Sequence, residues 1–392
     1  MVTFEELKKL DSQYVVQSYG RNPIAIDHGQ GATLYGPDGK EYIDFASGIG
    51  VLSVGTANPE WQAAVAGQAG KLAHISNLYY SEPYIRLAEK LCTRSGMAAA
   101  FFGNSGAEGN EGVIKLARKY SWEKYGEGRG TVITLNRSFH GRTITTLAAT
   151  GQDVFHKYFF PFTEGFRWAD PNIDSIRQAA GEDVCAVLVE LVQGEGGVLP
   201  LDPGFVHNLA KLCAERDWLF LVDEVQTGIG RTGSLFCFQQ YGVQPDALSF
   251  AKGIAGGLPM GGFLVNEKCR RVFGPGDHAS TFGGNPVAAA AANAVLDILD
   301  DEAISQVKGK GEYLRAAIES MDLPCLGKTR GMGLMIGVEV REGFSNKELC
   351  AKLNQTGLLS LTAGPGLRFL PPLTITKEEL DKGLAILKAA LS

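Results

Sequence analysis

Two short apolar runs, each followed at once by charge, dominate the hydrophobic pattern of this chain. The first covers residues 218–222 and leads into Asp223 and Glu224, and the second covers residues 247–251 and leads into Lys252. Their length and their polar flanking turns are typical of strands that a parallel sheet buries on both faces. Ligands of open α/β sheets bind in the crevice beyond the carboxyl ends of such strands. The pattern therefore predicts that Asp223 and Lys252 face the same rim of a sheet.

The central part of the chain continues this pattern. From about residue 60, amphipathic helical stretches alternate with short apolar runs, which indicates an α/β domain with a mainly parallel, doubly wound sheet. Further strands are expected at residues 98–102, 131–135 and 185–190. No repeat period and no low-complexity linker interrupts this alternation, so residues 56–304 are predicted to form one large domain.

The two ends of the chain are expected to build a small α+β domain together. Near the start, GATLYGPDGKEYIDF has a turn at residues 37–39 between aromatic-rich strands, which is typical of a hairpin. Near the end, residues 333–340 are predicted to form a strand and residues 366–373 an edge strand. The small domain would thus combine the segments 1–55 and 305–392.

Composition narrows the classes of function. The chain has 392 residues and a net charge of -6, whereas a nucleic-acid partner would require clustered Lys and Arg. Seven cysteines without a C-x-x-C pair are typical of free thiols in a reducing compartment. The first residues carry acidic side chains and lack the apolar core of a signal peptide, and no apolar run reaches the length of a bilayer span. A cytoplasmic protein without a nucleic-acid, membrane or metal partner is expected.

A carboxylate and an amine at one rim suit a pyridine aldehyde cofactor. The amine of Lys252 can bond covalently to the aldehyde carbon, and a carboxylate such as Asp223 opposite the ring nitrogen keeps that nitrogen protonated and electron-withdrawing. Gly253 and the pair Gly256 and Gly257 would let a cofactor approach without obstruction by side chains. The alternative is that Lys252 merely ends a strand in solvent, as most lysines would. The surrounding sequence favours the cofactor.

The motifs around both residues resemble those of a known enzyme family. VDEVQTGIGRTG around Asp223 and LSFAKGIAGGLPMGG around Lys252 are similar to segments of the class III (subgroup II) pyridoxal-phosphate-dependent aminotransferases, in particular of the acetylornithine branch. The resemblance extends over nearly the whole chain. It implies a fold-type I aminotransferase architecture, pyridoxal 5'-phosphate as the cofactor, and a homodimer with shared active sites. Lys252 and Asp223 would be the catalytic residues.

Further cofactor contacts are expected in several motifs. Ser105 and Glu108 form an S-x-x-E capping box, which leaves the backbone N–H groups of Gly106 and Ala107 at a helix N-terminus for a phosphate. The resemblance implies the other contacts: stacking on the ring by Phe139, His140 beside it, packing by Val225, a hydrogen bond from Gln226 to the phenolic oxygen, and a contact of Thr281 with the phosphate in the neighbouring subunit.

Substrate contacts are implied by the same resemblance. Arg142, in the segment F-H-G-R, would bind a substrate carboxylate, which suits a guanidinium because it binds bidentately and keeps its charge. Arg368 would be a second carboxylate-binding arginine, and Glu195 would pair with it until a dicarboxylate arrives. Ser280, in the loop with Thr281, completes the expected substrate site.

The resemblance implies transfer of the δ-amino group of N-acetylornithine to 2-oxoglutarate, giving N-acetylglutamate 5-semialdehyde and glutamate, in arginine biosynthesis. Ornithine, 4-aminobutyrate, lysine and succinyl-diaminopimelate stay open as donors, and an aminomutase is an alternative on the same cofactor. A nicotinamide oxidoreductase is the alternative from another class, because residues 228–233 match G-x-G-x-x-G. Such a fingerprint opens directly after a strand, with an acid at the end of the next strand. Here DEVQT intervenes and Asp246 precedes its strand, which disfavours this alternative.

Overall fold

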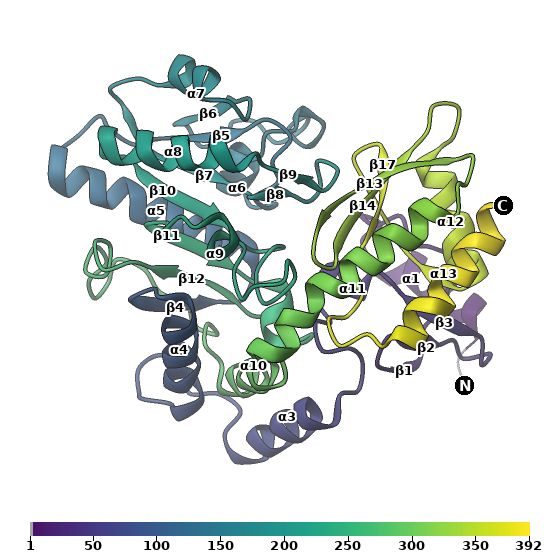
Figure 1. Cartoon of the computed structure of the whole chain (residues 1–392). Helices are drawn as coiled ribbons and strands as arrows, with labels where there is room; N and C mark the ends of the chain where they lie inside the picture. Colours follow the sequence, from purple (N-terminus) through teal and green to yellow (C-terminus); the bar gives the residue numbers. More distant parts are fainter. Residues whose placement is uncertain (1–2) are drawn as a thin grey trace.

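A seven-stranded sheet forms the centre of the larger half of the molecule (Figure 1). The structure is a computed structural model and describes residues 3–392. The strands lie in the order β4 (Ala99–Gly103), β12 (Gly261–Val265), β11 (Ala247–Phe250), β10 (Leu219–Asp223), β7 (Val184–Val189), β5 (Thr131–Leu135) and β6 (Phe166–Ala169). Neighbouring strands from β11 to β6 run parallel, whereas β12 is antiparallel to both β11 and β4. The α/β class and the mainly parallel sheet are confirmed.

Helices cover both faces of this sheet, which explains why its strands are continuous apolar runs. Along β10, Leu219 and Leu221 pack in the same core cluster as residues of α5 (Gly106–Tyr125). Phe220 and Val222 belong to a second cluster that includes residues of α8 (Pro203–Arg216). Burial of each such side chain stabilises the fold by roughly 1.5–3 kcal/mol. Both faces of the strand are thus fixed, and its carboxyl end is held in place.

Shorter elements complete the larger half. The other helices are α3 (Pro59–Lys71), α4 (Glu82–Ser95), α6 (Ile144–Ala149), α7 (Ile173–Ala179), α9 (Phe238–Tyr241) and α10 (Pro286–Ile298), with single 3-10 turns at Asp153–Phe155 and Lys252–Ala255 and a strand pair, β8 (Val192–Gln193) with β9 (Leu199–Pro200). Between residues 3 and 392, no helix has the length and apolar character needed to cross a bilayer. All seven cysteines are free thiols, as expected.

Strands from both ends of the chain form two further sheets. One has the order β1 (His28–Gln30), β2 (Thr33–Tyr35), β3 (Glu41–Asp44) and β15 (Leu358–Leu359); the other has the order β13 (Leu326–Met332), β14 (Met335–Val340), β17 (Gly366–Phe369) and β16 (Leu361–Ala363). The helices beside them are α1 (Phe4–Tyr14), α2 (Ser47–Gly50), α11 (Asp301–Ser320), α12 (Asn346–Thr356) and α13 (Lys377–Leu391). Figure 1 shows both chain termini in this half. We propose that it is a small domain, with boundaries near residues 55 and 304.

The prediction of an edge strand at residues 366–373 is wrong. β17 pairs with β14 on one side and with β16 on the other, and all four of its residues are buried. The sequence hides this position because β16 has only three residues and is joined to β17 by a two-residue turn at Gly364 and Pro365. So short a strand gives no recognisable alternation. The interior position fixes Arg368 within a buried strand.

The segment after β10 is held by the buried side chain of Glu224. Glu224 accepts a hydrogen bond from the hydroxyl of Thr227 at 2.5 Å and one from the backbone N–H of Phe238 at 2.8 Å. Its side chain is fully buried, and this burial raises the pKa of the carboxyl group to about 7. The contact joins the end of the central strand to the start of α9.

Helix α11 approaches the turn between β13 and β14 without room for a side chain. A Cβ atom on Gly311 would lie 1.9 Å from the carbonyl oxygen of Gly333. Gly309 lies in the same helix, and a Cβ atom there would have no heavy atom within 4 Å. The two glycines thus differ in packing while sharing a helix.

We expect Gly311→Ala to lower the free energy of unfolding by about 1–3 kcal/mol, because backbone must move to admit the methyl group. Gly309→Ala is the matched control, and it should raise that free energy by up to about 1 kcal/mol through the higher helix propensity of alanine. Thermal unfolding of both variants beside the unsubstituted protein measures the contrast. Equal rises in the two melting temperatures would contradict the close approach.

The raised pKa of Glu224 predicts a pH-dependent stability. The unfolded chain releases this proton near pH 4.5, whereas the folded protein keeps it until about pH 7. The folded state thus binds more protons in this window, so stability falls as pH rises through it, on the order of 2–3 kcal/mol for this group. Glu224→Gln should reduce the dependence of the melting temperature on pH between pH 5 and pH 8, and the part due to Glu190, whose pKa burial also raises to about 7, should remain. Glu342→Gln on the surface serves as the control. A variant profile parallel to that of the unsubstituted protein would reject this assignment.

Candidate active site

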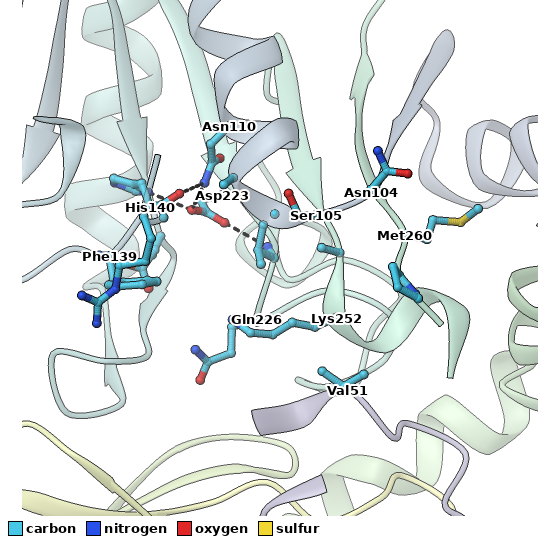
Figure 2. A pocket seen from close by; sticks show the side chains of 18 of the residues that line it. Val51, Asn104, Ser105, Asn110, Phe139, His140, Asp223, Gln226, Lys252 and Met260 are labelled. Carbon is cyan, nitrogen blue, oxygen red and sulfur yellow. Dashed lines mark hydrogen bonds and ion pairs between the residues drawn. The ribbon is translucent and has the colours of Figure 1, made fainter. Parts of the chain in front are cut away.

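The carboxyl ends of β5, β10 and β11 and the first turn of α5 surround a cavity of about 420 Å³. Asp223, Gln226 and Lys252 line it (Figure 2). Val225 is also part of its wall. The apolar runs therefore end where the sequence predicts, at one common crevice.

Asp223 is the centre of a buried hydrogen-bond network in this cavity. Its carboxylate accepts from the side-chain amide of Asn110 at 2.7 Å, from Nδ1 of His140 at 2.8 Å and from the backbone N–H of Val225 at 3.0 Å. Figure 2 shows these three contacts converging on Asp223. Because a carboxylate only accepts, Nδ1 of His140 carries a proton in this arrangement. The network fixes the orientation of a carboxylate that is 3% exposed.

Sequence reasoning missed Asn110 and its partner Ser249. Asn110 also donates to the backbone carbonyl of His140 at 2.7 Å, and its own side-chain oxygen accepts from the hydroxyl of Ser249 at 2.6 Å. The four residues in these contacts are all buried: Asn110, His140, Asp223 and Ser249. The available signal was a polar residue on the apolar face of α5, between the buried residues Gly109 and Gly112. A buried amide that is bonded on both sides must match its partners closely.

The N-terminus of α5 opens towards the cavity. The hydroxyl of Ser105 accepts from the backbone N–H of Glu108 at 3.2 Å, but the carboxylate of Glu108 accepts from the backbone N–H of Asn104 at 2.7 Å. The predicted capping box is therefore wrong in its second half, because Glu108 reaches one residue further back. Within residues 3–392 the N–H groups of Gly106 and Ala107 make no hydrogen bond. Both residues line the cavity, so these amides are available to an anion.

Gly106 is required for this arrangement. A Cβ atom on it would lie 2.6 Å from Cγ1 of Val225. Glycine thus allows Val225, the second residue after β10, to lie directly against the start of the helix.

Lys252 has a strained backbone and a shifted pKa. Its φ angle is 45°, in the left-handed region that residues other than glycine rarely adopt. Burial lowers the pKa of its amine, an effect that the guanidinium of Arg368 strengthens and the carboxylates of Glu195 and Asp223 oppose. An amine of lowered pKa exchanges protons more readily near neutral pH.

Sequence reasoning also missed Glu190, which it placed at a strand end without a role. Its carboxylate accepts from the backbone N–H of Phe139 at 2.7 Å and from that of Gly194 at 2.9 Å. Burial raises its pKa to about 7. Glu190 therefore joins the loop that carries Phe139 to the loop that carries Glu195.

Glu195 and Arg368 form the expected ion pair. Nη1 of Arg368 lies 2.6 Å from Oε1 of Glu195 and donates to the side-chain oxygen of Gln226 at 3.1 Å. Arg368 is 3% exposed, whereas the side chain of Glu195 is 27% exposed. Neither residue is part of the cavity wall, but Gln226 is. The pair therefore lies next to the cavity, and the more accessible partner is the carboxylate.

Arg142 lines the cavity and is exposed. Its Cζ atom lies 4.2 Å from the ring centroid of Phe155 and 5.5 Å from that of Phe139. Among residues 3–392, its guanidinium forms no ion pair and no hydrogen bond. All of its N–H donors are thus available to a ligand.

Ser280 and Thr281 lie outside the cavity of a single chain. The hydroxyl of Ser280 accepts from the side chain of Asn104 at 3.3 Å and from the backbone N–H of Gly283 at 2.9 Å. Thr281 is exposed to solvent. A single chain does not bring these two residues together with Lys252.

Residues 228–233, which match a dinucleotide fingerprint, form turns and open no helix. Arg231 within them is buried and donates to the backbone carbonyls of Leu334 and Pro371. The motif therefore connects the two halves of the molecule.

The cavity fits pyridoxal 5'-phosphate by the chemistry of its groups. It offers free amides at the N-terminus of a long helix for a phosphate, a buried carboxylate for a ring nitrogen, and an amine for an aldehyde. Gly106 keeps the phosphate end free of a side chain.

Comparisons with known proteins agree with this geometry. The family model for aminotransferase class-III matches residues 14–391. The acetylornithine aminotransferase of Haemophilus ducreyi is 49% identical over 393 residues and is covered completely, as is this chain. The ornithine aminotransferase from Toxoplasma gondii has a TM-score of 0.94 at 32% identity, covering 100% of this chain and 95% of that one. The acetylornithine aminotransferase from Elizabethkingia anophelis has a TM-score of 0.88 at 31% identity, covering 100% and 99%. The chain therefore belongs to the class III aminotransferases, the pyridoxal-phosphate-dependent family that its motifs resemble.

Proposed function

We propose that this enzyme transfers the δ-amino group of N-acetylornithine to 2-oxoglutarate, giving N-acetylglutamate 5-semialdehyde and glutamate. One observation carries the proposal: an amine, a buried carboxylate and a free arginine share one cavity, next to a second, masked arginine. The choice of donor is supported by the 49% identity with an acetylornithine aminotransferase over the whole chain. When bound, pyridoxal 5'-phosphate supplies an electron sink for the carbon that carries the amine.

Lys252 would hold the cofactor covalently and would move the proton. Its amine, whose pKa is lowered by burial, would serve as the base for the proton on the δ-carbon of the donor. The carboxylate of Asp223 would stabilise a protonated ring nitrogen, and the hydrogen bonds from Asn110 and His140 hold that carboxylate in place.

The remaining residues hold and orient the cofactor. The amides of Gly106 and Ala107 and the hydroxyl of Ser105 would bind the phosphate at the start of α5. Phe139 and Val225 would pack on the pyridine ring, and Gln226 would donate a hydrogen bond to its phenolic oxygen. These roles agree with the positions of all six residues in the cavity wall.

Two arginines allow one pocket to accept two kinds of acid. Arg142, whose donors are free, binds a carboxylate of either substrate. Arg368 is neutralised by Glu195 while the monocarboxylate donor is bound, and it becomes available when 2-oxoglutarate or glutamate brings a second carboxylate. The greater exposure of Glu195 supports this exchange, because the mobile partner must be the one that can reach solvent.

A panel of donors tests the proposed reaction. With 2-oxoglutarate as acceptor, N-acetylornithine should give a kcat/KM at least tenfold above ornithine, 4-aminobutyrate, lysine and succinyl-diaminopimelate. Lys252→Ala is the control and should lose turnover by more than about a thousandfold, because it removes both anchor and proton carrier. A higher kcat/KM for ornithine than for N-acetylornithine would show that ornithine is the preferred donor. Rearrangement of the donor without glutamate formation would point to an aminomutase.

We also propose that the active enzyme is a homodimer in which Thr281 binds the phosphate in the partner's site. Thr281 is exposed and lies outside its own cavity. It adjoins Phe282, which is 62% exposed, and the side chain of Asn77 binds the carbonyls of Ser280 and Gly283 in the same loop. The segment after Asn77 exposes three more large apolar side chains: Leu78, Tyr79 and Tyr80. Such a cluster around a polar loop is typical of a surface that a partner covers.

Thr281→Val keeps the shape of the side chain but leaves a phosphate oxygen without a donor. We expect pyridoxal-phosphate affinity to weaken by roughly 1–3 kcal/mol with the dimer still formed. In heterodimers of Thr281→Val with Lys252→Ala chains, the site that retains Lys252 receives the intact threonine and should recover its affinity in an equilibrium titration. An absence of recovery would place Thr281 in its own subunit's site or outside the site altogether.

A further inference from the structure

We propose that Phe155 is a positioning residue for Arg142 and thereby a determinant of which amine donors the enzyme accepts; this inference rests on the proposed function. The guanidinium carbon of Arg142 lies 4.2 Å from the ring centroid of Phe155, a stacking distance. The chemical class selected is that of ω-amines that also carry a carboxylate.

Phe155 and Phe139 provide the contacts that fix the Arg142 guanidinium. Arg142 is exposed, and within residues 3–392 it makes neither an ion pair nor a hydrogen bond. Its long side chain has large rotamer entropy, which an aromatic face reduces before a ligand arrives. A guanidinium that lies parallel to an aromatic ring contacts it through its face and keeps its N–H donors, which lie in its plane, free for a carboxylate. The ring thus orients the arginine without competing for its donors.

The ring of Phe155 is itself held in place by the segment that carries Phe139. It meets the ring of Phe139 edge to face, with centroids 5.7 Å apart and an interplanar angle of 76°. The backbone N–H of Phe155 donates to the carbonyl of Gln152 at 3.0 Å, and the side chain of Gln152 donates to the carbonyl of Ser138 at 2.9 Å. The 3-10 turn Asp153–Phe155 is therefore tied to the residue that precedes Phe139.

The contact between Phe155 and Arg142 links the choice of amine substrate to the face of one aromatic ring. A donor with a carboxylate gains from the oriented guanidinium, whereas an amine without one gains nothing. The ring must also be aromatic, because an aliphatic side chain of similar volume lacks the negative face that attracts a cation.

A double-mutant cycle with a matched control tests the inference in the holoenzyme. Phe155→Leu and Phe155→Met should raise the KM for N-acetylornithine roughly five- to twentyfold, with kcat within twofold. Phe155→Tyr keeps the ring and should stay within threefold of the unsubstituted enzyme. Arg142→Gln should raise the KM by a larger factor, and Phe155→Leu added to Arg142→Gln should cause no further rise, because the two residues act through one contact. Cofactor affinity and melting temperature are measured for each Phe155 variant, so that loss of the edge-to-face pair with Phe139 is separated from the effect on KM.

The outcomes separate this inference from the proposed function. If the KM effects of Phe155→Leu and Arg142→Gln multiply in the double variant, Phe155 acts independently of the arginine and the inference is wrong. Equal losses for Phe155→Tyr and Phe155→Leu would also overturn it, because they would show a packing role rather than one of the ring face. If Arg142→Gln leaves the KM unchanged, the carboxylate role of Arg142 fails, and this inference fails with it while N-acetylornithine turnover still stands.

Discussion

The hydrogen bonds accepted by the Asp223 carboxylate are the constraint on which this site depends. A buried carboxylate without partners costs several kcal/mol, so its donors are a condition of folding as well as of chemistry. Asn110 comes from α5 and His140 from the loop after β5, 113 and 83 residues away in the sequence. They meet Asp223 only if α5 packs on one face of the sheet with its first turns beside the carboxyl ends of the strands, which lie in the order β5, β7, β10 and β11. The order of the sheet and the position of one carboxylate therefore determine each other.

Two further buried carboxyl groups, besides that of Asp223, hold loops of this site in place. Glu190 and Glu224 each accept hydrogen bonds that join distant segments, and burial raises the pKa of both to about 7. A protonated carboxyl retains acceptor capacity but binds N–H groups less strongly than a carboxylate. The loops that carry Phe139 and Glu195 are therefore held by contacts of Glu190 whose strength changes with pH near 7.

The sequence predicts the parts of this site that follow from strand ends, and it predicts little that depends on packing. Asp223 and Lys252 could be identified as site residues from the sequence, because a charged residue directly after a buried strand has few purely structural explanations. Arg368 and Glu195 were placed together by family resemblance alone, since no local pattern relates residues so far apart. Asn110 was missed because one amide within a helix is an ordinary occurrence, and its role depends on the contact with Ser249, which is 139 residues away in the sequence. β17 was misjudged as an edge because a three-residue neighbour leaves no pattern.

Two buried arginines cross between the halves of the molecule in opposite directions. Arg231, from the segment after β10, donates to the carbonyls of Leu334 and Pro371 beside the small sheets. Arg368, from β17, reaches back to Glu195 and Gln226 at the cavity. A guanidinium has its donors in one plane, so each contact depends on orientation as well as on distance. The turn after β13 makes a third close contact between the halves, because a Cβ atom on Gly333 would lie 2.7 Å from the carbonyl oxygen of Arg231. A rotation of one half against the other would disturb all three contacts together, so the masked arginine is only as well placed as the interface that carries it.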